Sequence, residues 1–230
     1  NADEASEDAE AMLKEASLVA YIDNVVIAGL RQARFDANRG ALSPERSILV
    51  RETVREVLDN LSAPHATPTD MLQNLIGPHS GGAQAHGDEV VRDEQAAVAE
   101  PSNLATTNVL CVATKTPVEE AASDVLVHLL GKHGIAGRVV TPEATSLANL
   151  RKLDVDDVEL VLLVSLQLRE DSSRLRFLAR RLRQVLALDV PVVACFAEPG
   201  TTEGEYATPS TLEVDGVLDT CEAVLARCVS

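Results

Sequence analysis

The sequence of 230 residues predicts an α/β fold with a parallel sheet, preceded by a helical unit. Apolar strand-like runs alternate with amphipathic helical segments from residue 109 to the C-terminus, which is the pattern of parallel strands joined by crossover helices. The runs 160–165 and 191–196 are almost continuously apolar, as expected for strands that helices cover on both faces. Residues 18–61, in contrast, carry apolar side chains at helical spacing.

Composition excludes several classes of function. Aromatic residues make up 2% of the chain and the net charge is −16, so stacking platforms and a basic footprint for nucleic acid are both missing. The four cysteines show no C-x-x-C spacing, and we interpret them as small buried hydrophobes in a reduced compartment. No apolar run reaches the about 20 residues that a membrane-spanning helix needs. The chain begins with Asn1 instead of Met, and we expect an excised piece of a longer protein.

Residues 1–63 are predicted to form a helical domain. An acid-rich first helix is expected at 3–15, and a second helix ends near Gly40, a favourable C-terminal stop. Ser43 caps a third helix that has a proline at its first position. The short connection makes the second and third helices antiparallel neighbours. Residues 64–106 contain repeated proline and glycine and are predicted to be a linker.

The α/β domain is predicted to occupy residues 107–230. The expected strands are 109–113, 137–140, 160–165, 191–196 and 216–218, and the expected helices are 117–133, 143–153, 172–186 and from 221 to the end. A loop rich in Gly, Thr and Pro is expected at 197–209. Strands and helices that alternate in this way, with right-handed crossovers, predict a flavodoxin-like five-stranded sheet of order 2-1-3-4-5.

A candidate ligand site follows from this strand order, because the crevice of such a sheet lies between its first and third strands. The residues expected there are Thr114, Lys115 and Thr116 after the first strand, and Ser165, Gln167 and Arg169 after the third. Lys115, Ser165 and the N-terminus of the following helix could hold a small anionic or polar ligand. Pro117 removes one N–H group, however, and Glu119 and Glu120 oppose an anion. The alternative is an ordinary solvated loop that starts a helix.

No catalytic constellation is recognisable. The five histidines are irregularly spaced, and Asp124 with His128 fits a surface pair on one helix. The acidic pairs at 156–157 and 170–171 fit turns and helix starts. We therefore predict no catalytic residue, no metal ligand and no cofactor, and keep a hydrolase that uses the two strand-end loops as the less favoured alternative.

One predicted helix is strongly basic. It carries five arginines in an acidic chain: Arg174, Arg176, Arg180, Arg181 and Arg183. These side chains fit an ordinary solvated helix face. The alternative is a docking patch for an acidic partner, for the acidic first helix of the same chain, or for anionic lipid headgroups.

A helical unit followed by this α/β pattern resembles the cobalamin-binding modules of bacterial regulators. In that family a D-x-H-x-x-G motif after the first strand supplies a cobalt-ligating histidine, whereas residues 114–119 read Thr-Lys-Thr-Pro-Val-Glu here. Residues 196–199, Phe-Ala-Glu-Pro, also replace the family's paired glycines after the fourth strand. The resemblance implies a divergent cofactor-binding or small-molecule-binding module that lacks this histidine.

Two stretches resemble the cytoplasmic C-terminal extension of some bacterial permeases of the autoinducer-2 exporter family. One is 18–61, with 33–42 (Ala-Arg-Phe-Asp-Ala-Asn-Arg-Gly-Ala-Leu) as its most distinctive part, and the other is 109–153, with 116–122 and 130–134. The resemblance implies that a multi-pass membrane portion precedes this chain, at the cytoplasmic face of the bacterial inner membrane. From it we expect a non-catalytic sensory or regulatory domain. Its expected partners are that membrane portion, a small-molecule ligand and a second copy of the chain.

Overall fold

The computed structural model describes residues 18–62, 108–196 and 208–229. A five-stranded, all-parallel sheet has the order β2-β1-β3-β4-β5, so the predicted flavodoxin-like α/β fold is confirmed. The strands are β2 (Ala136–Val140), β1 (Asn108–Ala113), β3 (Leu160–Val164), β4 (Val192–Cys195) and β5 (Gly216–Leu218). The helix predicted at 3–15, the linker at 64–106 and most of the loop at 197–209 lie outside the described residues.

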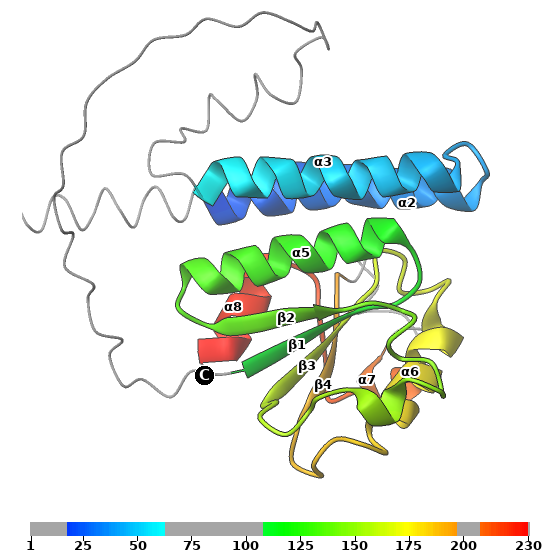
Figure 1. The fold of residues 1–230 in the computed structure, drawn as a ribbon, viewed down its shortest axis with the longest axis vertical. Coiled ribbons are helices and arrows are strands. Elements are labelled where there is room, and N and C mark those ends of the chain that lie inside the picture. The colour runs from blue at the N-terminus through cyan, green and yellow to red at the C-terminus, as the bar shows by residue number, and fades with distance from the viewer. Residues whose placement is uncertain (1–17, 63–107, 197–207, 230) are drawn as a thin grey trace, which may run out of the picture.

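The helices form layers on the two faces of the sheet (Figure 1). They are the π-helix η1 (Ile22–Ile27), α2 (Ala28–Asn38), α3 (Pro44–Ser62), α5 (Pro117–Lys132), the 3-10 helix η2 (Leu150–Lys152), α6 (Ser172–Leu182), α7 (Pro209–Leu212) and α8 (Cys221–Val229). Helices α5 and α8 cover one face of the sheet, and α6 and α7 lie on the other. Helices α2 and α3 are antiparallel neighbours, as predicted, and they form a further layer on the outer side of α5.

The helical hairpin and the α/β domain share one hydrophobic core. Ile22, Ile27 and Leu30 of the hairpin belong to the same buried cluster as Leu126 of α5 and Cys111 of β1. Burying one large aliphatic side chain contributes about 1.5–3 kcal/mol, so a few such residues are enough to hold the hairpin on α5. The position of the hairpin relative to the sheet is therefore fixed by packing as well as by the polar contacts described below.

Local signals in the sequence explain where the hairpin helices end and begin. Gly40 has φ +73°, a conformation that glycine adopts without steric cost, directly after α2. The Ser43 hydroxyl accepts a hydrogen bond from the Arg46 N–H at 3.3 Å, which makes it the predicted N-cap of α3. At α5, Thr116 and Glu119 form a capping box and Pro117 occupies the first turn.

The helix predicted at 143–153 is wrong. This segment is a series of turns that ends in the 3-10 helix η2, and its backbone bonds mostly span three residues. The Thr145 hydroxyl donates to the carbonyl of Pro142 at 2.8 Å, and the Asn149 amide donates to the carbonyl of Glu143 at 3.1 Å. Such side chains compete with the backbone for its partners, which favours turns over an α-helix. Helix α6 also ends at Leu182 instead of 186, where tighter turns follow.

Candidate functional site

The crevice between the carboxyl ends of β1 and β3 contains a side chain from the helical hairpin. Arg34 of α2 is 1% exposed. Its Nε donates to Oε1 of Glu119, near the start of α5, at 3.1 Å. Its Nη2 lies 3.3 Å from Oδ2 of Asp171, the residue that precedes α6. The guanidinium thus connects the hairpin to the two helices that follow β1 and β3.

Further polar side chains surround this ion pair. Arg34 also donates to Oδ1 of Asn38, one turn later on α2. The Asn38 amide donates to Oε1 of Gln167 and, at 2.7 Å, to Oε2 of Glu170. These bonds extend the network outward to a shallow depression of about 510 Å³ between α2 and residues 166–170. We call the set Arg34, Asn38, Glu119, Ser165, Gln167, Glu170 and Asp171 the crevice network.

The three predicted residues after β1 have different positions. Thr114 is buried, and its hydroxyl donates to the carbonyl of Val164 at 2.9 Å, so it joins β1 to β3. Thr116 caps α5, and its N–H donates to Oε2 of Glu119 at 2.8 Å. Lys115 is exposed and lies outside the crevice network. This loop therefore supplies structural contacts around Glu119, and its one cation points to solvent.

Two of the three predicted residues after β3 belong to the crevice network. Ser165 is fully buried, and its hydroxyl donates to Oδ2 of Asp171 at 3.2 Å. Gln167 is buried and accepts from Asn38. Arg169 is exposed. The cation that contacts these residues is Arg34 of the hairpin, in place of the predicted Lys115 and Arg169.

Burial controls the electrostatics of the crevice network. It raises the pKa of Glu119, and the nearby Asp171 carboxylate raises it further, while Arg34 and the Thr116 N–H oppose this shift. Arg34 brings one positive charge to two buried carboxylates. The raised pKa favours the neutral form of Glu119, which reduces the negative charge that faces Arg34.

The crevice network lacks the parts of a nucleophilic catalytic site. Its hydroxyl group, on Ser165, donates to a carboxylate, and no histidine belongs to the set. The four cysteines are buried on the α5 side of the sheet, and burial raises the pKa of each thiol, which makes them poor nucleophiles. Within the described residues, no group of three or more His, Cys, Asp or Glu side chains could hold a metal ion.

A second group of ion pairs joins the hairpin to α5. Arg51 of α3 pairs with Glu120 and lies 3.1 Å from Asp124, and Arg55 lies 2.8 Å from the same Asp124 carboxylate. Glu120, which the sequence suggested as an obstacle to anion binding, is thus used in a contact with α3. Asp124 was expected to form a surface pair with His128. Both of its carboxylate oxygens instead accept hydrogen bonds from arginine side chains of α3.

The hairpin also caps the last helix of the chain. Asp23 of η1 accepts hydrogen bonds from the N–H groups of Cys221 at 2.7 Å and Glu222 at 3.4 Å. A carboxylate at this position satisfies free N–H groups and stabilises the positive end of α8. Close by, Arg31 donates to the carbonyl of Asp219 at 3.2 Å.

Most arginines of α6, and Arg183 directly after it, bind other parts of the same chain. Arg180 pairs with Glu213, and Arg183 lies 2.9 Å from Asp215. Arg174 donates to the carbonyl of Thr114, and Arg181 donates to the carbonyl of Thr145 at 2.6 Å. These contacts occupy most of the basic side chains within the chain, while Arg176, Arg180 and Arg183 stay exposed, so the alternative of a docking patch stays a hypothesis.

The crevice residues that sequence reasoning missed are Arg34, Asn38, Glu119, Glu170 and Asp171. One signal was present, because Arg34 follows the buried Leu30 by four residues and so lies on the same buried face of the second helix. Asn38 lies one turn further along and is exposed. The carboxylates gave no such signal, since acids near helix starts are common as caps.

Two comparisons with known proteins give no match. No family model matches the chain, and no curated protein matches it either. In the part of the chain that the structure describes, no helix combines the length and the apolar character needed to cross a lipid bilayer. The functional argument therefore rests on the crevice and on the hairpin that covers it.

Proposed function

We propose that this chain is a non-catalytic regulatory domain of a bacterial membrane permease, held at the cytoplasmic face of the inner membrane. The carrying observation is that Arg34 of the hairpin fills the crevice where a flavodoxin-like sheet would hold a ligand. The Arg34 contacts join two parts of the chain, and a regulatory domain needs two parts that can be held together or released. The resemblance of residues 33–42 to a permease extension supplies the membrane context.

In this proposal the hairpin and the α/β domain form one signalling unit. Hairpin side chains bind α5 through Arg34 and Arg51, and they cap α8 through Asp23. A movement of the hairpin would therefore reach both helices on that face of the sheet. A conformational change in the membrane portion could reach the α/β domain through the hairpin. A conformational change in the α/β domain would reach the membrane portion through the same contacts.

The alternative of a cofactor-binding module remains a hypothesis. A cofactor at the strand ends would have to displace Arg34 and leave Glu119 and Asp171 to be paired by other groups. Reconstitution of the purified chain with cobalamin, followed by absorption spectroscopy, tests this alternative. A cofactor band that stays with the protein through gel filtration would support it.

The test of the leading proposal is a transport assay on the full-length permease. We expect deletion of this domain to change transport by the permease or its regulation, and Arg34→Met to reproduce part of that change. Arg46→Met, which replaces an exposed arginine of α3, is the matched control. If deletion leaves transport and its regulation unchanged, the proposal is wrong. An open reading frame without several upstream apolar segments of about 20 residues would also overturn it.

A further inference from the structure

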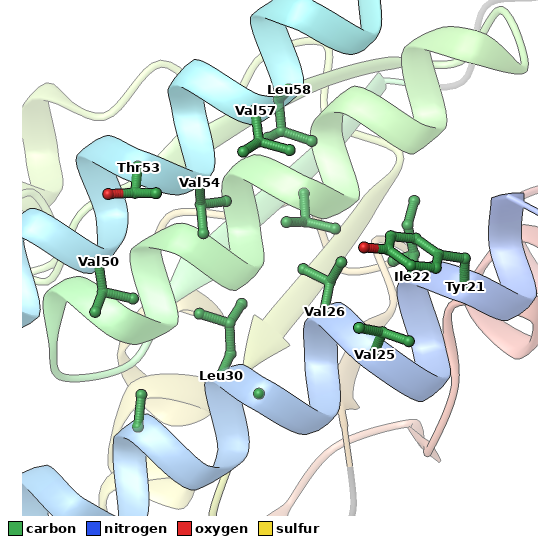
Figure 2. A pocket seen from close by; sticks show the side chains of 13 residues that line it. Tyr21, Ile22, Val25, Val26, Leu30, Val50, Thr53, Val54, Val57 and Leu58 are labelled. Atoms are coloured by element: carbon green, nitrogen blue, oxygen red, sulfur yellow. The ribbon is translucent and has the colours of Figure 1, made fainter. Parts of the chain in front are cut away.

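An apolar cavity of about 260 Å³ lies between the two hairpin helices, with α5 at its floor. Its lining comes from the region of η1 and α2 on one side and from α3 on the other, and none of the lining residues is charged. Figure 2 shows Val26 and Leu30 on one wall, facing Val50 and Val54 on the other. The cavity is separate from the crevice network, because the two share no residue.

The cavity has a closed floor and an open mouth. Ile22 and Leu30 are 1% and 3% exposed, which shows that the inner part is shielded from solvent. Val25, also in the lining, is 47% exposed and marks the rim. A small molecule could therefore enter without unfolding the hairpin.

A buried hydroxyl group in the lining has no partner. Among the described residues, nothing donates to or accepts from the Tyr21 hydroxyl, although its oxygen is buried. The Tyr21 ring reaches toward the space between the helices (Figure 2). An unpaired buried hydroxyl costs free energy, and a ligand with an oxygen acceptor would remove that cost.

The backbone is irregular at the same place. Tyr21 immediately precedes the π-helix η1, and Ile22, Val25 and Val26 of that helix line the cavity. A π-helix is rare, and single π turns inside α-helices are found often at functional sites. Here it lies on the wall that carries the unpaired hydroxyl.

We propose that this cavity binds a neutral aliphatic molecule of about ten heavy atoms, with one oxygen that accepts from Tyr21. The size follows from the cavity volume, since an apolar cavity of about 150 Å³ accommodates benzene. Neutrality follows from the lining, because a carboxylate or phosphate would be buried without a counter-charge. Medium-chain ketones and alcohols fit both conditions. The biological role of this ligand as a signal rests on the proposed function, but its binding does not.

The probe is 2-nonanone, titrated into the purified chain with ¹³C-labelled Val and Leu methyl groups. We expect saturable NMR shifts for Val26, Val50 and Val54, and none for Leu188, whose side chain is fully exposed away from the cavity. Methyl shifts that are absent, or that do not saturate, overturn the inference. Cavity methyl signals that change with protein concentration before any ketone is added would assign the cavity to a second copy, and this also overturns it.

Variants make the test specific. A side chain added at Gly29 would meet open space inside the cavity lining, so Gly29→Leu should fill the cavity and weaken 2-nonanone binding more than tenfold. Gly131→Leu is the matched control, because Gly131 also has open space and lies outside the cavity. Tyr21→Phe should weaken the ketone about fivefold, as expected for one hydrogen bond, and leave nonane binding unchanged. Unchanged ketone affinity in both Gly29→Leu and Tyr21→Phe would overturn the inference.

The outcome is distinguishable from that of the proposed function. Absent methyl shifts overturn the ligand site and leave the permease assay unaffected. Transport that is insensitive to deletion of the domain overturns the proposed function and leaves the measured binding in place.

Discussion

Replacement of Arg34 by methionine is the sharpest test of the crevice network. The Arg34 guanidinium lies 3.1 Å from Glu119 and 3.3 Å from Asp171, and the side chain is 1% exposed. Methionine retains most of the aliphatic stem, so the main change is the loss of a buried cation. Removing one partner of a buried ion pair costs about 3–5 kcal/mol, because the remaining charges have no compensation. We expect the lower end, about 3 kcal/mol at pH 7, since Glu119 can take up a proton.

The measurement is urea unfolding at pH 7, followed by far-ultraviolet circular dichroism. Arg46→Met serves as the control, because Arg46 is exposed on α3, and substitutions of that kind change stability by about 0.5 kcal/mol or less. Hydrogen exchange gives a second measurement. Amides of α5 should exchange faster in the Arg34→Met protein, since the hairpin that covers this helix is held less firmly.

A loss of stability below about 1 kcal/mol would refute the argument, because it would place the cation in a well-solvated environment. A triple variant separates charge from packing. Arg34→Met with Glu119→Gln and Asp171→Asn removes all three charges and keeps a side-chain oxygen at position 119 that can accept from the Thr116 N–H. Removal of all charges of a buried ion pair together often restores the lost stability. If the triple variant is as unstable as the single one, the cost arises from packing and the electrostatic explanation is wrong.

Three further predictions concern local contacts. Glu119→Gln should flatten the dependence of stability on pH. The folded-state pKa of the Glu119 carboxyl is raised, so its unfavourable contribution to stability is present above that pKa and disappears as pH falls through it. Urea midpoints at pH 7 and pH 5 measure this, and an equal change of midpoint with pH in both proteins would contradict the prediction. Asp23→Ala should cost about 1 kcal/mol and speed exchange of the Cys221 amide, and unchanged exchange would exclude the cap. Gly40→Ala should destabilise the protein by about 1 kcal/mol, because φ at Gly40 is +73°. Gly131→Ala, inside α5, should stabilise the protein by about 0.5–1 kcal/mol. A melting temperature that is higher for Gly40→Ala than for Gly131→Ala would contradict both.

The strands were predictable because their signal is local and strong. Leu160–Val164 and Val192–Cys195 are buried on both faces, so every residue in them is apolar and their bounds follow from the sequence within a residue. The segment 143–153 gave a misleading helical pattern. Its apolar spacing suits a helix, but Thr145 and Asn149 bind backbone carbonyls and keep it in turns. The difference depends on side-chain geometry that spacing does not describe.

The ligand site at the ends of β1 and β3 stays a prediction, and the side chains found there differ from those expected. Strand order located Ser165 and Gln167, and both belong to the crevice network. It also selected Lys115 and Arg169, which are exposed. A loop of two or three residues can direct its side chains in several ways, so spacing identifies the strand end and leaves the direction of each side chain open. The residue that fills the crevice belongs to another part of the chain.

The contacts of Arg34 could not be predicted from the sequence, because they join distant segments of the chain. Its partners Glu119 and Asp171 are 85 and 137 residues away in the sequence, so no local pattern joins them. Glu119 has a second role, because its Oε2 accepts from the Thr116 N–H that begins α5 while its Oε1 accepts from Arg34. The carboxylate that starts this helix therefore also anchors the hairpin. Variants at Glu119 should affect both contacts, whereas variants at Arg34 should hold the hairpin less firmly and leave the capped end of α5 in place.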